Sequence, residues 1–342
     1  MQIKPQRSKM LDVLLALLPL VVISIYFYGF RALIITVSTV LFADLCDYLC
    51  VRALKMKHRA KGDISWLVTG LIFSLSMSAA IPYWISIYGM LFAIVVAKAP
   101  FGGYGKNIFN PAAAGIAFVA ISFQAQMFAY PQPYLKLPLD MDLSLVGFST
   151  ENSPAFSLNA GGEPVMRQLD VLLSNYSGPM GATALVVLGA CALFLLFRRS
   201  ASFQTMAAAV VSLSVVAFLF PRLEINRVFS IGYELIAGIF LFAVVFMAND
   251  PVTTPKTGFG KVLFGVWLGV GTMLVRYFGY IELAAIFPLL IGNALTPKFD
   301  LLAHKLYKKR HASQLPSADQ IITVEVNSLK VPEEMREVDQ ND

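Results

Sequence analysis

Charged residues are scarce in this chain, and their scarcity excludes an ordinary soluble domain. Asp, Glu, Lys and Arg make up 14% of the 342 residues, while 57% of the residues are hydrophobic. Soluble domains carry about a quarter charged residues, so the composition alone predicts a membrane protein. The sequence also lacks a recognisable pairing of a nucleophile with a base, and we therefore expect no hydrolytic chemistry.

Cysteine is also scarce, and the three cysteines are too few for a disulfide framework. Cys46 and Cys50 are four residues apart and would share one face of a helix. They would suit a metal ion or a redox pair, although small apolar packing residues are the commoner use of such cysteines. Cys191 falls in the middle of an apolar run, where we expect it to pack.

Long apolar runs dominate what the chain does contain. A membrane-crossing helix needs about 20 mostly apolar residues, because only a helix or a closed barrel satisfies its own backbone in lipid. We therefore predict an all-α polytopic membrane protein with about ten transmembrane helices. The predicted spans are residues 10–28, 31–50, 64–80, 82–99, 111–130, 183–197, 202–220, 229–248, 259–276 and 281–296.

Lys and Arg are distributed unequally between the two sets of connections, and this predicts the orientation. Nineteen of them flank one set of span ends and six flank the other. Positive residues concentrate on the cytoplasmic side of membrane proteins, so we expect both termini in the cytoplasm and segment 131–182 outside. Because the positive charges lie beside span ends, the net charge of +6 does not indicate a nucleic-acid partner.

The spacing of the runs predicts two halves of five helices each. The first half would cover residues 1–130 and the second residues 183–300. Five is an odd number, so the second half starts on the opposite side of the membrane, as in an inverted repeat. Segment 131–182 reads as an extracytoplasmic loop rich in Pro, Ser, Asn and Gly, and residues 301–342 as a polar, disordered cytoplasmic tail.

Two connections rich in Gly, Asn, Thr and Pro are candidate binding segments. The first, residues 100–112, offers the amides of Asn107 and Asn110 just before a helix that begins at Pro111. The second, residues 249–260, offers hydroxyl groups that include Thr253. Non-helical backbone near the membrane is tolerated where it is buried in protein or lines a cavity, which indicates a cofactor or ion site. The alternative for each segment is an ordinary tight loop.

A third candidate segment, residues 177–183, precedes the sixth run on the predicted outer side. Thr183 would stand in the first turn of that helix, where free N–H groups and partial positive charge favour a phosphate ester. Gly178, Gly181 and Ala182 would leave room for a bulky attached group, and Ser177 opens the segment. The alternative is that these small residues only pack the start of the helix.

Several charged residues lie at membrane depth, where each requires an explanation. Asp44 and Glu234 are the deepest acids, and they are candidates for an ion path. Asp47, Arg276 and Glu282 lie closer to span ends, and Arg276 is placed to pair with Glu282. The alternative is that these groups serve as structural pairs or extend to the interface.

Taken together, three motifs resemble one known family. They are Gly102-Gly-Tyr-Gly-Lys-Asn-Ile-Phe-Asn-Pro-Ala112, Asp250-Pro-Val-Thr-Thr-Pro255 and Gly181-Ala-Thr-Ala-Leu185. The chain resembles the D subunit of the Rnf-type ion-translocating electron-transport complex, which is related to the B subunit of the sodium-pumping NADH:quinone reductase. The resemblance covers nearly the whole chain, up to about residue 300.

The resemblance implies a membrane flavoprotein in the bacterial cytoplasmic (inner) membrane. FMN would be bound covalently through its phosphate to Thr183, on the periplasmic side, and would relay electrons. A second, non-covalent flavin such as riboflavin would lie near Asn107, Asn110 and Thr253. The family motif is of the Ser-Gly-Ala-Thr type, whereas here the serine is at 177 and Gly178-Pro-Met intervenes before Gly181.

The resemblance also implies partners, a maturation step and an activity. Other membrane and peripheral subunits would complete the complex, and a flavin transferase would attach the FMN. The complex would exchange electrons between ferredoxin and NAD and couple this to Na⁺ or H⁺ translocation. Two rival interpretations of the residues are a solute or ion channel or transporter with inverted repeats and no redox cofactor, and a membrane scaffold without a cofactor.

Overall fold

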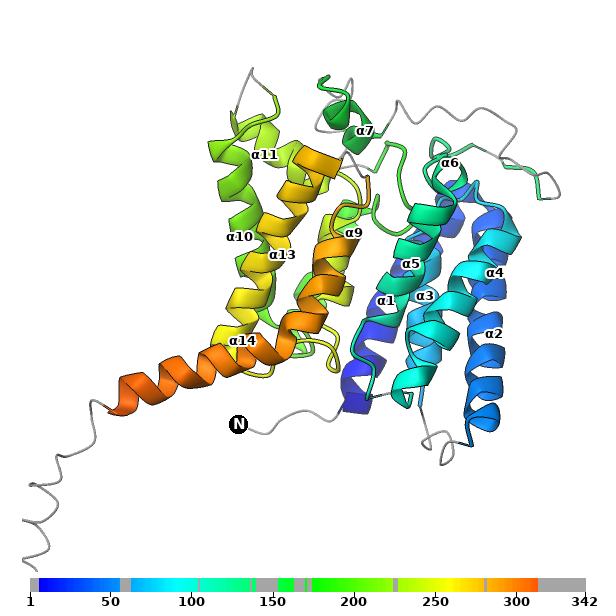
Figure 1. Cartoon of the computed structure of the whole chain (residues 1–342). Helices are drawn as coiled ribbons and strands as arrows, with labels where there is room; N and C mark the ends of the chain where they lie inside the picture. Colours follow the sequence, from blue (N-terminus) through cyan, green and yellow to red (C-terminus); the bar gives the residue numbers. More distant parts are fainter. Residues whose placement is uncertain are drawn as a thin grey trace, which may run out of the picture. The chain divides into compact units, whose positions relative to one another are not determined.

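The computed structural model describes residues 6–55, 63–103, 105–135, 137–139, 153–162, 170, 174–223, 227–279 and 282–312. Every regular element in these residues is a helix, and they contain no strand (Figure 1). Residues 1–300 form one compact unit and residues 301–342 a second. The description that follows concerns the first unit, in which both candidate sites lie.

The first half of the chain contributes a bundle built around two long helices. These are α1 (Gln6–Tyr28) and α2 (Phe30–Ala53), which pack on α3 and α4. The helix α4 continues into a π-helical turn, where the Ala97 N–H donates to the Phe92 carbonyl at 3.2 Å. The other elements are α3 (Ser65–Leu75), α4 (Tyr83–Leu91), η1 (Phe92–Val96), η2 (Ala99–Phe101), α5 (Pro111–Ser122) and α6 (Gln124–Met127).

The second half contributes a bundle in which α10 and α13 pair along their length. They approach closely because Gly265 and Gly269 of α13 lie against the α10 backbone, where an added Cβ atom would collide with carbonyl oxygens. The elements are α7 (Pro154–Asn159), α9 (Leu185–Phe197), α10 (Phe203–Leu219), α11 (Arg227–Ile236), α12 (Phe240–Phe242), η5 (Ala243–Met247), α13 (Gly258–Gly279) and α14 (Ile286–Ala312).

The prediction of an all-helical, multi-pass membrane protein is confirmed, and each of the ten predicted spans contains a helix. Among the described residues, five helices are long and apolar enough to cross a bilayer, and α11 together with the bent continuation of α12 and η5 makes a sixth candidate. The other four apolar helices have 11 to 17 residues. At 1.5 Å per residue, those four are shorter than the roughly 30 Å hydrocarbon core, so non-helical chain adjoins them at membrane depth.

The predicted span 64–80 is wrong beyond Leu75, because α3 ends there and an irregular, buried segment follows. Its free carbonyl groups are held by Arg31, a side chain that is 1% exposed. The guanidinium donates to Ala79 at 3.0 Å and to Ile81 at 3.3 Å. A buried cation thus replaces the helical hydrogen bonds that the break removes.

The predicted span 229–248 is also interrupted, by a 60° bend between α11 and α12. Gly238 stands at the bend with φ +65°. Arg276 donates to the carbonyl oxygens of Glu234 and Ala237 at 2.5 Å and 2.7 Å, and so holds the end of α11. Both breaks fall in the third predicted span of their half, as an inverted repeat requires, although the repeat itself stays a prediction.

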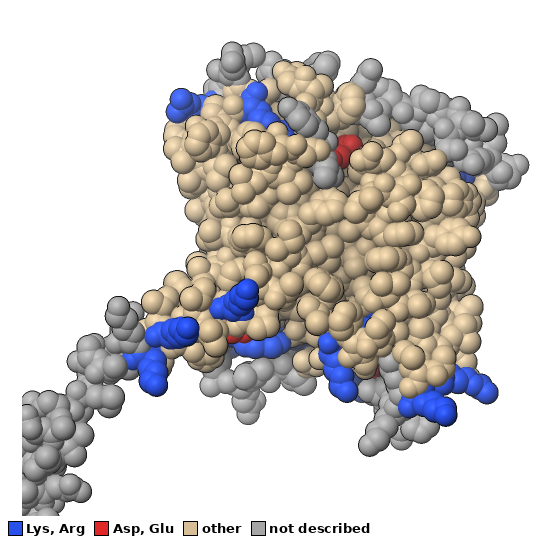
Figure 2. All heavy atoms as spheres, in the orientation of Figure 1, with Lys and Arg blue, Asp and Glu red and all other residues tan. Residues whose placement is uncertain are grey.

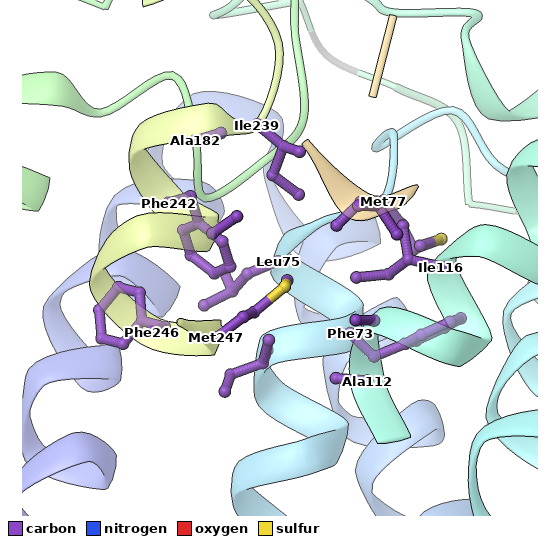
Figure 3. Close-up of a cluster of buried hydrophobic side chains, with 14 of the residues drawn as sticks. Phe73, Leu75, Met77, Ala112, Ile116, Ala182, Ile239, Phe242, Phe246 and Met247 are labelled. Atoms are coloured by element: carbon purple, nitrogen blue, oxygen red, sulfur yellow. The ribbon is translucent and has the colours of Figure 1, made fainter. Parts of the chain in front are cut away.

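The junction between the two halves is a packed apolar cluster (Figure 3). Side chains from the end of α3, from α5 and from α12 and η5 meet there, and the break residue Ile239 joins them. Phe73, Leu75, Met77, Phe242 and Met247 are all 0% exposed. Burial of this much apolar surface holds the two halves together.

Two predicted extramembrane segments contain helices. The predicted outer loop 131–182 includes α7, while residues 140–152, 163–169 and 171–173 of it lie outside the described residues. The predicted disordered tail is wrong in its first part, because α14 continues to Ala312. Residues 313–342 lie outside the described residues.

Candidate functional site

The segment before α9 crosses the end of α3, and this crossing positions Thr183. The Gly181 N–H donates to the Leu75 carbonyl at 2.7 Å, and the Met180 N–H donates to the Met77 carbonyl at 3.0 Å. The last carbonyl groups of a helix have no partner within the helix, so a crossing chain with free N–H groups satisfies them. Thr183 is therefore held inside the protein, two residues beyond this crossing.

Four buried hydroxyl groups near this crossing have no hydrogen-bond partner among the described residues. They belong to Tyr28, Tyr130, Ser177 and Thr183, and each side chain is at most 1% exposed. The hydroxyls of Tyr28 and Thr183 face each other, yet their geometry falls short of a hydrogen bond. Buried polar groups in folded proteins are almost always paired, so four unpaired ones indicate a missing partner. We call this group the Thr183 site.

The helix position predicted for Thr183 is wrong by two residues. The helix α9 begins at Leu185, and Ala184 occupies the N-cap position. The Leu185 N–H bonds back to the Thr183 carbonyl at 2.8 Å, which makes a tight turn before the first helical turn. The Thr183 hydroxyl therefore lies just outside the N-terminus of α9, within reach of its partial positive charge.

The small residues of the segment are occupied by packing rather than by open space. A Cβ atom on Gly181 would lie 2.7 Å from the Leu75 Cβ atom, and Ala182 is buried in the core. A Cβ atom on Gly178 would lie 2.9 Å from the Thr183 methyl group. Gly178 thus keeps the Thr183 side chain uncrowded, whereas Gly181 permits the close crossing of α3.

A buried acid lies beside the Thr183 site. Glu282 is 7% exposed, and its carboxylate accepts a short hydrogen bond from the Ser153 hydroxyl. Burial raises the pKa of Glu282 to about 7, and the Ser153 bond opposes that rise. Tyr130 is close enough to feel the charge of Glu282, and Tyr28 is close to Tyr130. Tyr130 thus links the acid to Tyr28, which faces Thr183.

The predicted pairing of Arg276 with Glu282 is wrong. Arg276 pairs with Glu234 at 2.7 Å, and Arg222 approaches the same carboxylate at 2.5 Å. The bend after α11 turns Glu234 toward α13, which sequence spacing along straight helices does not predict. Glu234 was a candidate for an ion path, and two guanidinium groups hold it in place.

A second candidate region, the Asn107 pocket, lies where the N-terminal end of α5 meets the end of η5. Six of its polar or charged lining residues are Ser65, Lys98, Asn107, Asn110, Asn249 and Asp250. Thr253 is outside the lining, but its hydroxyl donates to Asp250 at 2.9 Å. The structure therefore brings the predicted residues Asn107, Asn110 and Thr253 together.

The amides of this pocket already have protein partners. The Asn110 side chain caps α5 by accepting from the Ala113 N–H at 3.2 Å, and Asn107 donates to the Phe109 carbonyl at 3.0 Å. Asn293 of α14, which sequence reasoning missed, bridges the segments 100–112 and 249–260. Its side chain accepts from the Asn110 N–H at 3.0 Å and donates to the Thr253 carbonyl at 3.3 Å.

The charged lining of the pocket is paired as well. The Lys98 ammonium donates to the Asp47 carboxylate at 2.7 Å and to the Ser65 hydroxyl at 2.8 Å. Asp47 and Lys98 are 5% and 2% exposed, so this is a buried ion pair rather than an interfacial one. Asp44, one turn earlier on α2, is half-buried.

The cysteines lie apart from both regions. Cys46 and Cys191 are buried in the apolar core, and Cys50 packs partly against it. Among the described residues, no three His, Cys, Asp or Glu side chains form a group that would hold a metal ion. Sequence reasoning also missed Tyr28 and Tyr130, because tyrosines at span ends are ordinary membrane-interface residues.

Comparisons with known proteins show the family to which this chain is related. The sequence model of the NQR2, RnfD, RnfE family matches residues 3–308 of this chain. The D subunit of the ion-translocating oxidoreductase complex of Halorhodospira halophila is 30% identical over 321 residues, covering 85% of this chain and 88% of its own. The proteins of the same name from Shewanella piezotolerans and Haemophilus ducreyi are 29% and 27% identical. They cover 86% and 85% of this chain, and 91% of their own length in both cases.

Proposed function

The chain belongs to the NQR2, RnfD, RnfE family, and we propose that it is the flavin-carrying membrane subunit of an ion-translocating oxidoreductase complex. In this proposal the complex exchanges electrons between ferredoxin and NAD and couples the exchange to Na⁺ or H⁺ movement. The protein lies in the bacterial inner membrane with both termini in the cytoplasm and Thr183 on the periplasmic side. Other subunits of the complex supply and receive the electrons.

The observation that carries this proposal is the set of unpaired hydroxyls at the Thr183 site. FMN joined through its phosphate to Thr183 would supply redox chemistry, and a phosphate offers several strong acceptor oxygens. The hydroxyls of Tyr28, Tyr130 and Ser177 are donors without partners among the described residues, so they fit such a group. The N-terminal end of α9 adds partial positive charge beside it.

The burial of Thr183 adds a condition on maturation. Its side chain is 0% exposed, and a flavin transferase cannot reach it in this conformation. We expect the transferase to act while the segment before α9 is still exposed, before its two backbone hydrogen bonds to the end of α3 form. The phosphate would then be enclosed as the crossing closes.

The Asn107 pocket is the proposed place of a second, non-covalent flavin such as riboflavin. Its lining of amides, a hydroxyl and an ammonium suits the polar edge of an isoalloxazine ring, which has both donors and acceptors. Because most of these groups already have protein partners, a ligand there would share existing hydrogen bonds rather than satisfy orphaned ones.

The rival interpretation as a solute channel is disfavoured by the junction between the halves. A permeation path between inverted repeats would pass through this junction, where Phe73, Phe242 and Met247 are 0% exposed. Figure 3 shows Leu75, Phe242 and Met247 between the end of α3 and the segment of α12 and η5. A scaffold without a cofactor would leave the four hydroxyls of the Thr183 site unexplained.

Flavin fluorescence of the denatured polypeptide tests the proposal. In cells that contain the flavin transferase, the wild-type band on a denaturing gel should fluoresce, and Thr183→Ala should be dark. Thr253→Ala is the matched control and should stay bright, because denaturation removes a non-covalent flavin in any case. A dark wild-type band, or a bright Thr183→Ala band, would refute covalent attachment at this residue.

A further inference from the structure

A strongly basic pocket lies where α9 ends and where α10 and α13 begin. Five of its thirteen lining residues are Lys or Arg and none is Asp or Glu; the five are Lys9, Arg198, Arg199, Lys256 and Lys261. Figure 2 shows that Lys and Arg gather at this end of the molecule, where α1 and α13 start. We call it the basic pocket; it shares Asn249 and Pro251 with the Asn107 pocket, but none of its five cations lines that pocket.

Nearby acids neutralise only part of this charge. Asp12 pairs with Arg198 at 3.1 Å and also accepts a hydrogen bond from the Ser200 hydroxyl. Asp300 accepts from the backbone N–H groups of Lys256 and Thr257. Asp250 also interacts with Lys256. Counting these three acids against the five cations leaves an excess of two positive charges, which favours an anionic ligand.

The backbone at Arg199 favours a role for its side chain in the pocket. Arg199 has φ +55°, the left-handed conformation that favours glycine. It ends α9 by the usual turn, in which its N–H donates to the Leu196 carbonyl and the Ser200 N–H to the Leu195 carbonyl, both at 2.9 Å. Glycine would make this turn with less strain, so an arginine here adds charge at an energetic cost.

The start of α10 adds further donors to the pocket. Ser202 is the N-cap residue of this 17-residue helix, and its side chain makes no capping hydrogen bond. Ser202 and Thr205 both line the pocket. The first N–H groups of the helix therefore face the same space as the five cations, and together they suit a phosphate.

Exposed aromatic side chains next to the pocket point to the source of that phosphate. Phe197 and Phe203, which precede and follow the turn between α9 and α10, are 88% and 69% exposed. Phe259 at the start of α13 is 47% exposed. A pocket at helix ends lies at headgroup depth, and apolar rings beside it would contact acyl chains, which a soluble anion lacks.

We propose that the basic pocket binds the phosphate headgroup of an anionic membrane lipid, with its acyl chains against Phe197, Phe203 and Phe259. Arg199, Lys256 and Lys261 contact the phosphate together with the first turn of α10. The lipid would fix the ends of α9, α10 and α13 relative to one another. The proposal does not depend on either flavin.

Binding of fluorescent phosphatidylglycerol to the detergent-solubilised full-length chain tests this, with phosphatidylcholine as the neutral comparison. Arg199→Gly with Lys261→Gln removes two pocket charges while the glycine keeps the turn. We expect binding of phosphatidylglycerol to weaken about 30-fold, since each cation near the surface contributes about a fivefold change. The weak binding of phosphatidylcholine should not change.

A matched control replaces Lys55 by Gly and Arg52 by Gln at the end of α2. Lys55 also has a left-handed backbone, with φ +48°, and both residues lie outside the pocket. This variant should bind phosphatidylglycerol within twofold of wild type. Equal loss in both double variants would mean that the lipid responds to net charge alone, and the pocket would not be a site.

Two further results would overturn the lipid assignment. Saturable binding of inorganic phosphate in the pocket, without retention of phosphatidylglycerol, would make the ligand a soluble anion. Unchanged lipid binding together with impaired assembly of the complex would make the pocket a docking site for an acidic protein surface.

Discussion

The Thr183 site and the Asn107 pocket are both buried and polar, but they differ in how their polar groups are satisfied. At the Thr183 site, four buried hydroxyls have no partner among the described residues. At the Asn107 pocket, the side chains of Lys98, Asn107 and Asn110 all bond to protein atoms. The first region is incomplete as it stands, whereas the second is stable by itself.

This difference indicates that the two regions contribute to different properties. An unpaired buried hydroxyl destabilises the fold until a ligand satisfies it, so residues of the Thr183 site should matter for the cofactor. A fully paired network stabilises the fold, so residues of the Asn107 pocket should matter for stability. The distinction fails if substitutions in the two regions have the same effect.

The largest effect on stability is expected from Lys98→Met in the Asn107 pocket. It leaves the buried Asp47 carboxylate without its ion-pair partner, which typically costs about 3–5 kcal/mol. The thermal inactivation of the purified protein in detergent should shift to a clearly lower temperature. The double variant Asp47→Leu with Lys98→Met should recover most of the loss, because neither charge remains.

Tyr130→Phe is the counterpart at the Thr183 site. It removes a hydroxyl that has no described partner, so the flavin-free protein should change by less than about 1 kcal/mol. Flavin loading should fall, since a donor to the phosphate is gone. A Tyr130→Phe variant as unstable as Lys98→Met would contradict the distinction between the two regions.

A smaller effect, and one that depends on pH, is expected at Glu282. Its pKa is about 7 in the folded protein against 4.5 for a free glutamate, so the folded state keeps its proton longer. Stability should therefore fall as pH rises from 4.5 to 7, by up to about 3 kcal/mol, and then level off. The melting temperature of Glu282→Gln should change less across this pH range than that of the wild type.

Ser153→Ala sharpens that test, because the Ser153 hydroxyl stabilises the charged form of Glu282. Without it the pKa of Glu282 rises further, and the decline in stability should extend to higher pH. A wild-type profile that matches that of Glu282→Gln would show that this carboxyl does not titrate in the range.

A loss of stability that does not depend on pH is expected from Gly181→Ala, at the crossing beside Thr183. The added Cβ atom would meet the Leu75 Cβ atom at 2.7 Å, and such overpacking costs roughly 1–3 kcal/mol. Gly189→Ala is the control, since an added Cβ atom there would meet nothing within 4 Å beyond the adjacent backbone of its own helix, and alanine favours helix. Melting temperatures should drop for the first and hold or rise for the second.

The sequence predicts the helices well because apolar runs report burial in lipid directly. It does not predict where α3 ends or where α11 bends, since both breaks are stabilised by distant side chains. Arg31 precedes the carbonyl groups that it holds by about 50 residues, and Arg276 follows the end of α11 by about 40. Local propensity contains no signal for such contacts.

The candidate sites are predictable from the sequence only where their residues lie in segments that interrupt a regular helix. Gly- and Pro-rich segments, which indicate non-helical backbone, contain Thr183, Ser177, Asn107 and Asn110. The sequence around Tyr28, Tyr130 and Asn293 is ordinary for a helix or loop. These residues can be identified as candidates only once the packing of the helices is known. Sequence therefore reveals the segments that break a regular pattern, but not the partners that regular helices bring to them.

Mass spectrometry of the peptide that contains Thr183, from protein purified out of native membranes, is the sharpest test of covalent flavin attachment. We expect this peptide to carry FMN joined through its phosphate to the Thr183 hydroxyl. An unmodified Thr183 peptide, from cells in which the flavin transferase is active, would be incompatible with a flavin-carrying subunit of this kind.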